Sequence, residues 1–329
     1  MSNSSLINQN VSKIVEILHE HDSFAVISHT SPDGDTLGSA AALCYALRQL
    51  NKKCVLLCDG KPSDALKDIS ELNEFISEDQ TIADYDAFIA VDCADLKRLG
   101  KWAGAYNSSD IKVVIDHHIT NCGFGDVNYI ENYPACAQLV FNIIDALGIG
   151  LNKEIATCLY VAFLTDTGRF SYRGVNEITM NYVARLYGCG LDFEHINRII
   201  FSQRTFEKSK LLAKALDNLR LWLDGRVSVI FIGYDDYSRL VGEGCDTEGI
   251  VNYALDVKGC YAAVFAYEFE PGKTKVSFRS VSTKYNVSLI ASSFGGGGHI
   301  QAAGCTQYTD VKDAEELLFK AFSEHFVGK

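Results

Sequence analysis

Histidine and aspartate side chains recur in a few short segments that lie far apart along the chain. Residues 29–35, HTSPDGD, hold one histidine and two aspartates in a turn, and Asp92, residues 116–118 (DHH) and Asp166 follow later. Carboxylates held this close repel one another, so a fold that brings them together needs a compensating charge. Oxygen and imidazole ligands without thiolate suit divalent ions such as Mn²⁺. Two such ions can clamp a phosphoryl group for in-line attack, so this set of residues predicts metal-assisted phosphoester hydrolysis.

Each of these residues also has a simpler interpretation. An aspartate at the end of a strand is more often a turn former or a helix cap, and Asp35 could cap the helix that follows it. Two adjacent histidines, as at residues 117–118, are more often a surface or packed-core feature than a site. The metal interpretation therefore depends on a fold that delivers all of these side chains to one place.

The apolar segments before these residues indicate how they would be brought together. Residues 24–28, 86–91 and 111–115 are short apolar runs typical of buried strands, and each ends beside the histidines or aspartates. Residues 53–58 are a further strand-like run. Helix-like segments separate the runs, which is the pattern of a parallel sheet covered on both faces. The carboxyl ends of parallel strands form the ligand crevice of such a sheet, so the side chains would meet at one rim. Residues 153–166 form a predicted buried helix that ends at Asp166.

The same alternation along the chain predicts the fold class. We expect an α/β protein with an N-terminal, mainly parallel sheet flanked by helices, a helical connector and a smaller C-terminal α/β domain. The three parts are placed at residues 1–190, 191–225 and 226–329. In the last part, strand-like runs, a hairpin turn at Pro271 and Gly272, a glycine run and a terminal helix follow one another.

Composition limits the class of protein and its partners. Hydrophobic residues make up 47% and charged residues 22% of the 329 residues, as in a soluble globular protein. The net charge of −12 argues against binding long DNA or RNA, which needs a basic surface, but not against a short anionic ligand beside a bound cation. No signal peptide or membrane span is evident, and the eleven scattered cysteines are typical of buried thiols in a reducing compartment. We therefore expect a cytoplasmic protein without membrane association.

Several motifs together resemble those of one family. HTSPDGDTLGS, VDCAD with the following RLG, DHH and TDTGRFSY occur in the order of the four motifs of the DHH phosphoesterase superfamily. The later SFRS and FGGGGHIQAAG are similar to the DHH-associated C-terminal domain of that superfamily. The resemblance extends from about residue 20 to about residue 310. It is strongest to the subfamily of nanoRNases, oligoribonucleases that also remove the 3′-phosphate of 3′-phosphoadenosine 5′-phosphate.

The resemblance implies two metal ions, most simply Mn²⁺, with Mg²⁺ or Co²⁺ as alternatives. The implied ligands are His29 and Asp33 for one ion, Asp35, His117 and Asp166 for the other, and Asp92 shared by both. Asp116 would accept a hydrogen bond that fixes the tautomer of an imidazole, and His118 would face the scissile phosphate, which makes these two the implied catalytic pair.

The C-terminal domain would bind the substrate, again as the resemblance implies. The implied residues are Arg279, Ser280, Gly296, Gly297, Gly298 and His299. Strand alternation directs Arg279 away from the face of Phe278 and Ser280, so that its guanidinium can offer paired donors to a terminal phosphate. Glycine backbone without side chains lets amides approach a phosphate closely.

The implied function is a metal-dependent phosphodiesterase and phosphatase. Its substrates would be very short oligoribonucleotides, degraded to mononucleotides, and the nucleoside bisphosphate 3′-phosphoadenosine 5′-phosphate, hydrolysed to AMP. The resemblance leaves open a homodimer. One alternative is a phosphodiesterase for cyclic dinucleotides or their linear dinucleotide products, and a more remote one is a nucleotide sensor without catalysis. A pyrophosphatase or polyphosphatase is less favoured, because the glycine-rich segment at His299 resembles the nucleotide-handling branch.

Overall fold

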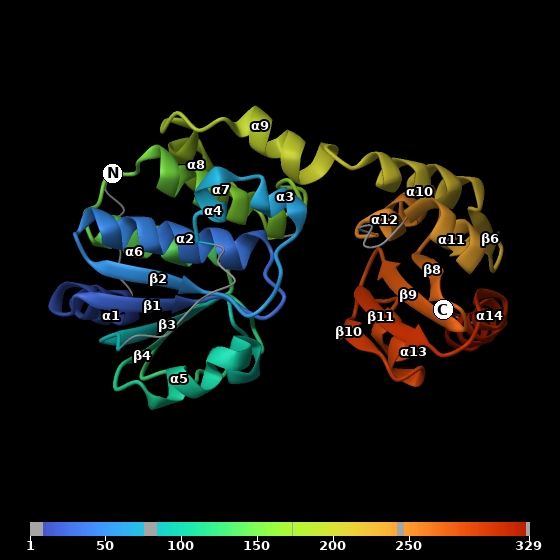
Figure 1. Cartoon of the computed structure of the whole chain (residues 1–329), viewed down its shortest axis with the longest axis horizontal. Coiled ribbons are helices and arrows are strands. Elements are labelled where there is room, and N and C mark those ends of the chain that lie inside the picture. The colour runs from blue at the N-terminus through green and yellow to red at the C-terminus, as the bar shows by residue number, and fades with distance from the viewer. Residues whose placement is uncertain (1–8, 76–83, 173, 242–246, 327–329) are drawn as a thin grey trace. The chain divides into compact units, whose positions relative to one another are not determined.

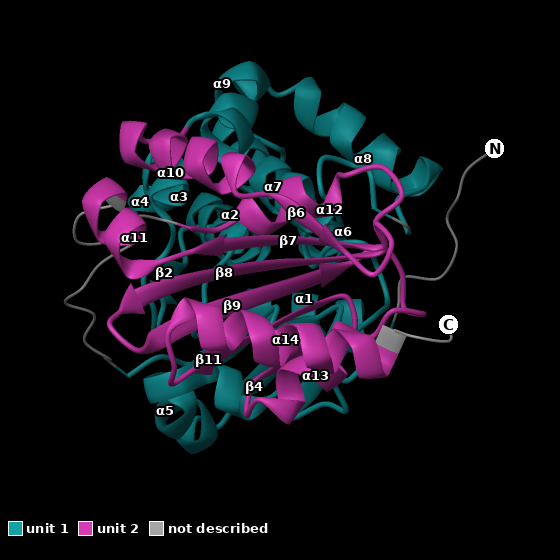
Figure 2. Cartoon of the chain, turned by 90° about the vertical axis from the view of Figure 1, so that its right-hand side faces the viewer, with its two compact units in different colours: residues 1–203 teal, residues 204–329 magenta. Residues whose placement is uncertain are grey.

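The computed structural model describes residues 9–75, 84–172, 174–241 and 247–326. The chain forms two compact units, residues 1–203 and 204–329, which Figure 2 shows in separate colours. The boundary between them falls inside the segment predicted as a helical connector. Each unit contains one sheet with helices packed against it, so the predicted α/β class is confirmed.

The first unit is built on a five-stranded parallel sheet in the order β2-β1-β3-β4-β5. Its strands are β1 (Ser23–Ile27), β2 (Lys53–Leu57), β3 (Ala87–Val91), β4 (Lys112–Asp116) and β5 (Val127–Ile130). The first four lie where apolar runs predict them. The fifth is short and mixes polar with apolar residues, which is why its sequence carries no strong strand signal.

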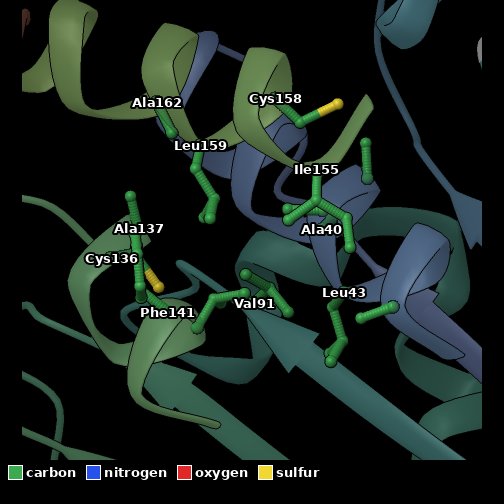
Figure 3. Close-up of a cluster of buried hydrophobic side chains, with 14 of the residues drawn as sticks. Ala40, Leu43, Val91, Cys136, Ala137, Phe141, Ile155, Cys158, Leu159 and Ala162 are labelled. Atoms are coloured by element: carbon green, nitrogen blue, oxygen red, sulfur yellow. The ribbon is translucent and has the colours of Figure 1, made fainter. Parts of the chain in front are cut away.

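Helices cover both faces of this sheet (Figure 1). They are α1 (Gln9–Glu20), α2 (Gly34–Gln49), α3 (Asp64–Lys67), α4 (Ser70–Asn73), η1 (Leu96–Trp102), α5 (Ala103–Ser108), α6 (Ala137–Ala146), α7 (Lys153–Asp166), α8 (Glu177–Tyr187), α9 (Phe193–Asn197) and η2 (Arg198–Ser202). One face packs against α2 and α6, and α7 packs on these helices from outside, as the side chains of Leu43, Phe141 and Leu159 near Val91 in Figure 3 show. The other face packs against η1 and α5.

Helix α2 lies between the sheet and α7 and is buried along most of its length. This explains its small residues and the absence of a polar face, because a helix that is enclosed on all sides needs no solvent-facing stripe. Close packing depends on Gly38, where an added Cβ would lie 2.4 Å from the carbonyl oxygen of Cys158 in α7. The N-terminus of α2, which carries Asp33 and Asp35, is thereby fixed against the sheet.

The second unit is a six-stranded mixed sheet in the order β10-β11-β9-β8-β7-β6, in which only β7 and β8 pair in parallel. Its strands are β6 (Arg220–Trp222), β7 (Val227–Ile232), β8 (Ala262–Glu270), β9 (Lys273–Ser280), β10 (Gly297–His299) and β11 (Ala302–Gln307). Helices α10 (Phe206–Asp217), α11 (Tyr234–Val241) and α12 (Ile250–Leu255) pack on one face, and α13 (Val287–Ser293) and α14 (Val311–Phe326) on the other. The turn at Pro271 and Gly272 joins β8 to β9, so the predicted hairpin is confirmed.

Every helix in the described part of the chain is too short or too polar to span a lipid bilayer.

Candidate active site

The turn between β1 and α2 places His29 and Asp33 side by side. The carboxylate of Asp33 caps α2, because its Oδ1 accepts hydrogen bonds from the backbone N–H groups of Asp35 and Thr36 at 3.1 Å each. Its Oδ2 is left facing the buried ring of His29, 3.5 Å from Nε2. The backbone N–H of His29 donates to the hydroxyl of Thr36, which fixes the turn to the first turn of the helix.

Asp35 caps a helix, but not the helix that its sequence position suggests. Its Oδ2 accepts the backbone N–H of Cys136 at 2.6 Å, and its Oδ1 accepts the backbone N–H of Ala137 at 3.1 Å, both at the start of α6. The hydroxyl of Ser39 donates to Oδ1 as well. The N–H groups at the start of a helix favour negative charge, so the start of α6 both orients the buried side chain of Asp35 and suits its charged form. Its Oδ2 also faces His117 Nε2, at 3.9 Å.

Asp92, the residue after β3, lies between two histidines. Its Oδ1 is 3.3 Å from His117 Nε2, and its Oδ2 is 3.7 Å from His29 Nε2. The side chain is buried, and Oδ1 has no hydrogen-bond partner among the described residues. Its backbone has a positive φ of 59°, a conformation that costs energy for a residue other than glycine and is concentrated at functional sites. Both the strain and the unsatisfied oxygen indicate a position selected for its chemistry.

The ring of His117 is oriented by the backbone. Its Nδ1 lies 2.8 Å from the carbonyl oxygen of Tyr133, which can only accept a hydrogen bond. Nδ1 therefore carries the proton and, in the neutral ring, the lone pair is on Nε2. That Nε2 faces the carboxylates of Asp92, Asp35 and Asp166. Asp166 is the last residue of α7, and its Oδ2 lies 3.6 Å from His117 Nε2. A backbone carbonyl that fixes the tautomer in this way is typical of a metal-binding histidine.

His118, the next residue, is held by a different group. Its Nδ1 lies 2.8 Å from Oδ1 of Asp116, the buried last residue of β4. The amide of Asn121 donates to the other oxygen of Asp116, at 2.7 Å. Burial alone would raise the pKa of Asp116, but the hydrogen bonds from His118 and Asn121 outweigh it, so the pKa is lowered and the carboxylate stays ionised. Sequence reasoning missed Asn121, although it follows the DHH motif closely in a turn.

The electrostatics of the cluster favour added positive charge. Burial, reinforced by neighbouring carboxylates, raises the pKa of Asp35 and Asp92, and it raises the pKa of Asp166 to about 6. Burial would lower the pKa of His117, but the carboxylates around it dominate and raise it to about 10. Without a metal ion the cluster thus retains protons to offset its own negative charge, and a divalent cation would supply that charge instead.

The side chains form three overlapping groups in which one ligand atom from each residue lies within 4.8 Å of the others. The groups are His29, Asp33 and Asp92; Asp35, His117 and Asp166; and Asp92, His117 and His118. The first two have only oxygen and imidazole nitrogen donors, and both oxygens of Asp92 face a histidine of one of them. This donor set fits two hard or borderline divalent ions. In the third group His118 already uses Nδ1 to bind Asp116, so we do not count it as a ligand.

In the second unit, strand register places Arg279 and His299 on one face of the sheet. Ala302 of β11 pairs with Arg279 of β9 on one side and with His299 of β10 on the other. Residues paired across antiparallel strands share a face. Ser280 lies on the opposite face, where it is buried and donates its hydroxyl hydrogen bond to the carbonyl oxygen of Ser282.

The glycines before His299 differ in whether the fold requires a residue without a side chain. A Cβ on Gly296 would lie 2.2 Å from the carbonyl oxygen of Gly304, and Gly298 has a φ of 139°, so the fold itself requires glycine at both positions. Gly297 pairs with Gly304, is exposed, and would meet no atom within 4 Å if it carried a Cβ. It lies on the same face as Arg279 and His299. Packing therefore does not explain the missing side chain at Gly297.

Comparison with known proteins identifies both parts of the chain. The family described as "DHH family, N-terminal domain" matches residues 23–163, and "DHHA1 domain" matches residues 237–327. A bifunctional oligoribonuclease and PAP phosphatase NrnA from Thermus thermophilus is 29% identical over 91% of this chain and 89% of its own length. Its namesake from Bacillus subtilis is 25% identical over 93% of this chain and 96% of its own length.

Solved structures share the fold. A crystal structure of an exopolyphosphatase-related protein from Bacteroides fragilis superposes with a TM-score of 0.89, at 24% identity, over 98% of both chains. The exonuclease RecJ bound to manganese has a TM-score of 0.52 at 15% identity and covers 98% of this chain and 96% of its own. At these identities the likeness concerns the fold alone.

Proposed function

Because the chain belongs to the DHH family and carries a DHHA1 domain after its DHH domain, we propose that it is a metal-dependent nanoRNase and phosphatase. It would degrade very short oligoribonucleotides to mononucleotides and hydrolyse 3′-phosphoadenosine 5′-phosphate to AMP, the activities for which the relatives along most of its length are named. The observation that carries the proposal is the carboxylate of Asp92, whose two oxygens face His29 and His117 from between two groups of ligands.

We propose that the chain's own residues hold two divalent cations, most simply Mn²⁺. His29 and Asp33 would bind one, Asp35, His117 and Asp166 the other, and Asp92 both. When bound, such ions offset the charge of a phosphoryl group and lower the pKa of water, which supplies the nucleophile at neutral pH. The residues around them keep the donors in place: α6 holds Asp35, and the Tyr133 carbonyl holds His117.

His118 would act on the phosphate ester directly. The ring donates from Nδ1 to Asp116, which leaves Nε2 for the substrate, and this hydrogen bond raises the pKa of His118. A protonated Nε2 is a donor for a non-bridging oxygen or for the leaving oxygen. In the second unit, Arg279, Gly297 and His299 would bind a terminal phosphate from one face of the sheet, with Gly297 admitting the ligand where a side chain would obstruct it.

A substrate panel tests the function. Purified protein would be incubated with a linear diribonucleotide, 3′-phosphoadenosine 5′-phosphate, a cyclic dinucleotide and pyrophosphate at equal concentration, each with Mn²⁺, Mg²⁺ or Co²⁺. We expect turnover of the first two, fastest with Mn²⁺, because these belong to the substrate classes that the relatives' names specify. Turnover confined to the cyclic dinucleotide or to pyrophosphate would reject the proposal, and tight nucleotide binding without turnover would indicate a sensor.

A further inference from the structure

Asn121 lies in the turn after β4, and its side-chain amide makes three hydrogen bonds. Nδ2 donates to Oδ2 of Asp116 at 2.7 Å and to the backbone oxygen of Cys93 at 3.0 Å, and Oδ1 accepts from the backbone N–H of Gly123 at 2.8 Å. The orientation of the amide is unambiguous, because the flipped amide would set its oxygen against two groups that can only accept. Both amide hydrogens and one acceptor position of the amide oxygen are thus used inside the protein.

These hydrogen bonds fix the carboxylate that holds His118. Asp116 is buried, and its two oxygens are divided between the His118 ring at 2.8 Å and the Asn121 amide at 2.7 Å. If one oxygen of a buried carboxylate lacks a hydrogen bond, the folded state is destabilised by about 1–3 kcal/mol or more. Without the Asn121 amide, the Asp116 carboxylate would therefore rotate to find a new partner. The Asn121 amide prevents that rotation and thereby holds the ring of His118 in one orientation.

The same amide joins two strand ends. Cys93 directly follows Asp92, and its carbonyl oxygen accepts the second Nδ2 hydrogen of Asn121. The loops after β3 and β4 are therefore tied to each other by one uncharged side chain. Asn121 supports the site through these hydrogen bonds to Asp116 and to the backbone after Asp92.

We propose that Asn121 is a positioning residue for phosphoester hydrolysis, acting through Asp116 to hold His118 in its reactive orientation. The inference rests on the proposed function for the identity of the reaction. The chain of hydrogen bonds from Asn121 through Asp116 to His118 does not depend on that function. The reaction requires His118 to present Nε2 to the ester, and the hydrogen bond at Nδ1 is what aims it.

The test substitutes Asn121→Asp and uses Asn128→Asp as the matched control. N121D keeps the volume and the acceptor for Gly123 but removes both Nδ2 hydrogens and sets a second carboxylate against Asp116. Asn128, in β5, also uses both ends of its amide: Oδ1 accepts from the backbone N–H groups of Phe124 and Gly125, and Nδ2 donates to the carbonyl oxygen of Gly125. Its substitution by aspartate is chemically identical, keeps those acceptors and removes the Nδ2 donor.

Kinetics form the first readout, with a linear diribonucleotide and Mn²⁺. We expect N121D to lower kcat about 10- to 100-fold with a much smaller change in KM, and N128D to leave kcat close to wild type. In a His118→Ala background, N121D should lower kcat by no more than about threefold, because residues that act as one unit are not additive. Full additivity of N121D and H118A, or an equal loss of kcat in N128D, would overturn the proposal.

Proton NMR of histidine-labelled, metal-free protein gives a second readout that needs no turnover. The imidazole Nδ1–H signal of His118, assigned by its loss in H118A, should persist in wild type and N128D and disappear through faster solvent exchange in N121D. Persistence of the signal in N121D would reject the positioning role. If wild type shows the signal but hydrolyses no dinucleotide, the proposed function fails while the NMR comparison still decides the role of Asn121.

Discussion

Replacement of Asp92 by asparagine is the most direct test of the proposed two-ion site. Asparagine has the same size and tolerates the positive φ of this position, so the backbone should be unaffected. What changes is one negative charge that lies 3.3 Å from His117 Nε2 and 3.7 Å from His29 Nε2. At an effective dielectric constant of about 20, a unit charge pair about 4 Å apart contributes about 4 kcal/mol. Loss of that contribution corresponds to about 10³-fold weaker cation binding.

Isothermal titration with Mn²⁺ and hydrolysis of a diribonucleotide would measure the effect of D92N. Metal-free D92N should melt no lower than wild type, because burial raises the pKa of Asp92 and the neutral amide removes a charge that the apo protein disfavours. Asp95→Asn is the matched control, since Asp95 caps η1 through Lys97 and Arg98, and asparagine can accept the same hydrogen bonds. Manganese affinity and activity of D92N within a few-fold of wild type would refute the assignment of Asp92 as the shared ligand.

Three further outcomes follow from the same geometry. Gly297→Ala should leave the melting temperature unchanged but raise KM for 3′-phosphoadenosine 5′-phosphate. Gly298→Ala should lower the melting temperature, because this residue has a φ of 139°. Equal changes in melting temperature for the two variants would contradict this prediction. In chelator, stability measured by thermal melts should fall as pH rises from about 6.5 towards about 10, because the folded protein holds the His117 proton that the unfolded chain releases at 6.5; this slope should flatten with Mn²⁺. Gly38→Ala should destabilise the first unit by about 1–3 kcal/mol in urea unfolding, since its Cβ would collide with the Cys158 carbonyl of α7, and an unchanged midpoint would contradict the packing described.

The alternation of apolar runs and helical segments predicts most of the architecture. The runs that became β1 and β3 are continuously apolar and those of β2 and β4 mostly so, and such runs are recognisable without any long-range information. The sequence patterns did not predict the short strands β5, β6 and β10, which lie at the edges of the two sheets. Such strands take their conformation from a neighbour's hydrogen bonds rather than from their own residues, as β10 does with its two glycines.

For the site, the sequence by itself determined which chemistry was available: aspartates and histidines directly after the strands of a parallel sheet, in the order of the DHH motifs. The tertiary structure alone decided how each would be used. Asp35 caps α6 rather than its own helix, Tyr133 supplies the carbonyl that sets the tautomer of His117, and Asn121 ties Asp116 to the loop after β3. These partners come from other loops and helix ends. Asp35 and Cys136, for example, are 101 residues apart in the sequence. Local patterns register propensity and periodicity, whereas such hydrogen bonds exist only once the chain has brought distant segments into contact.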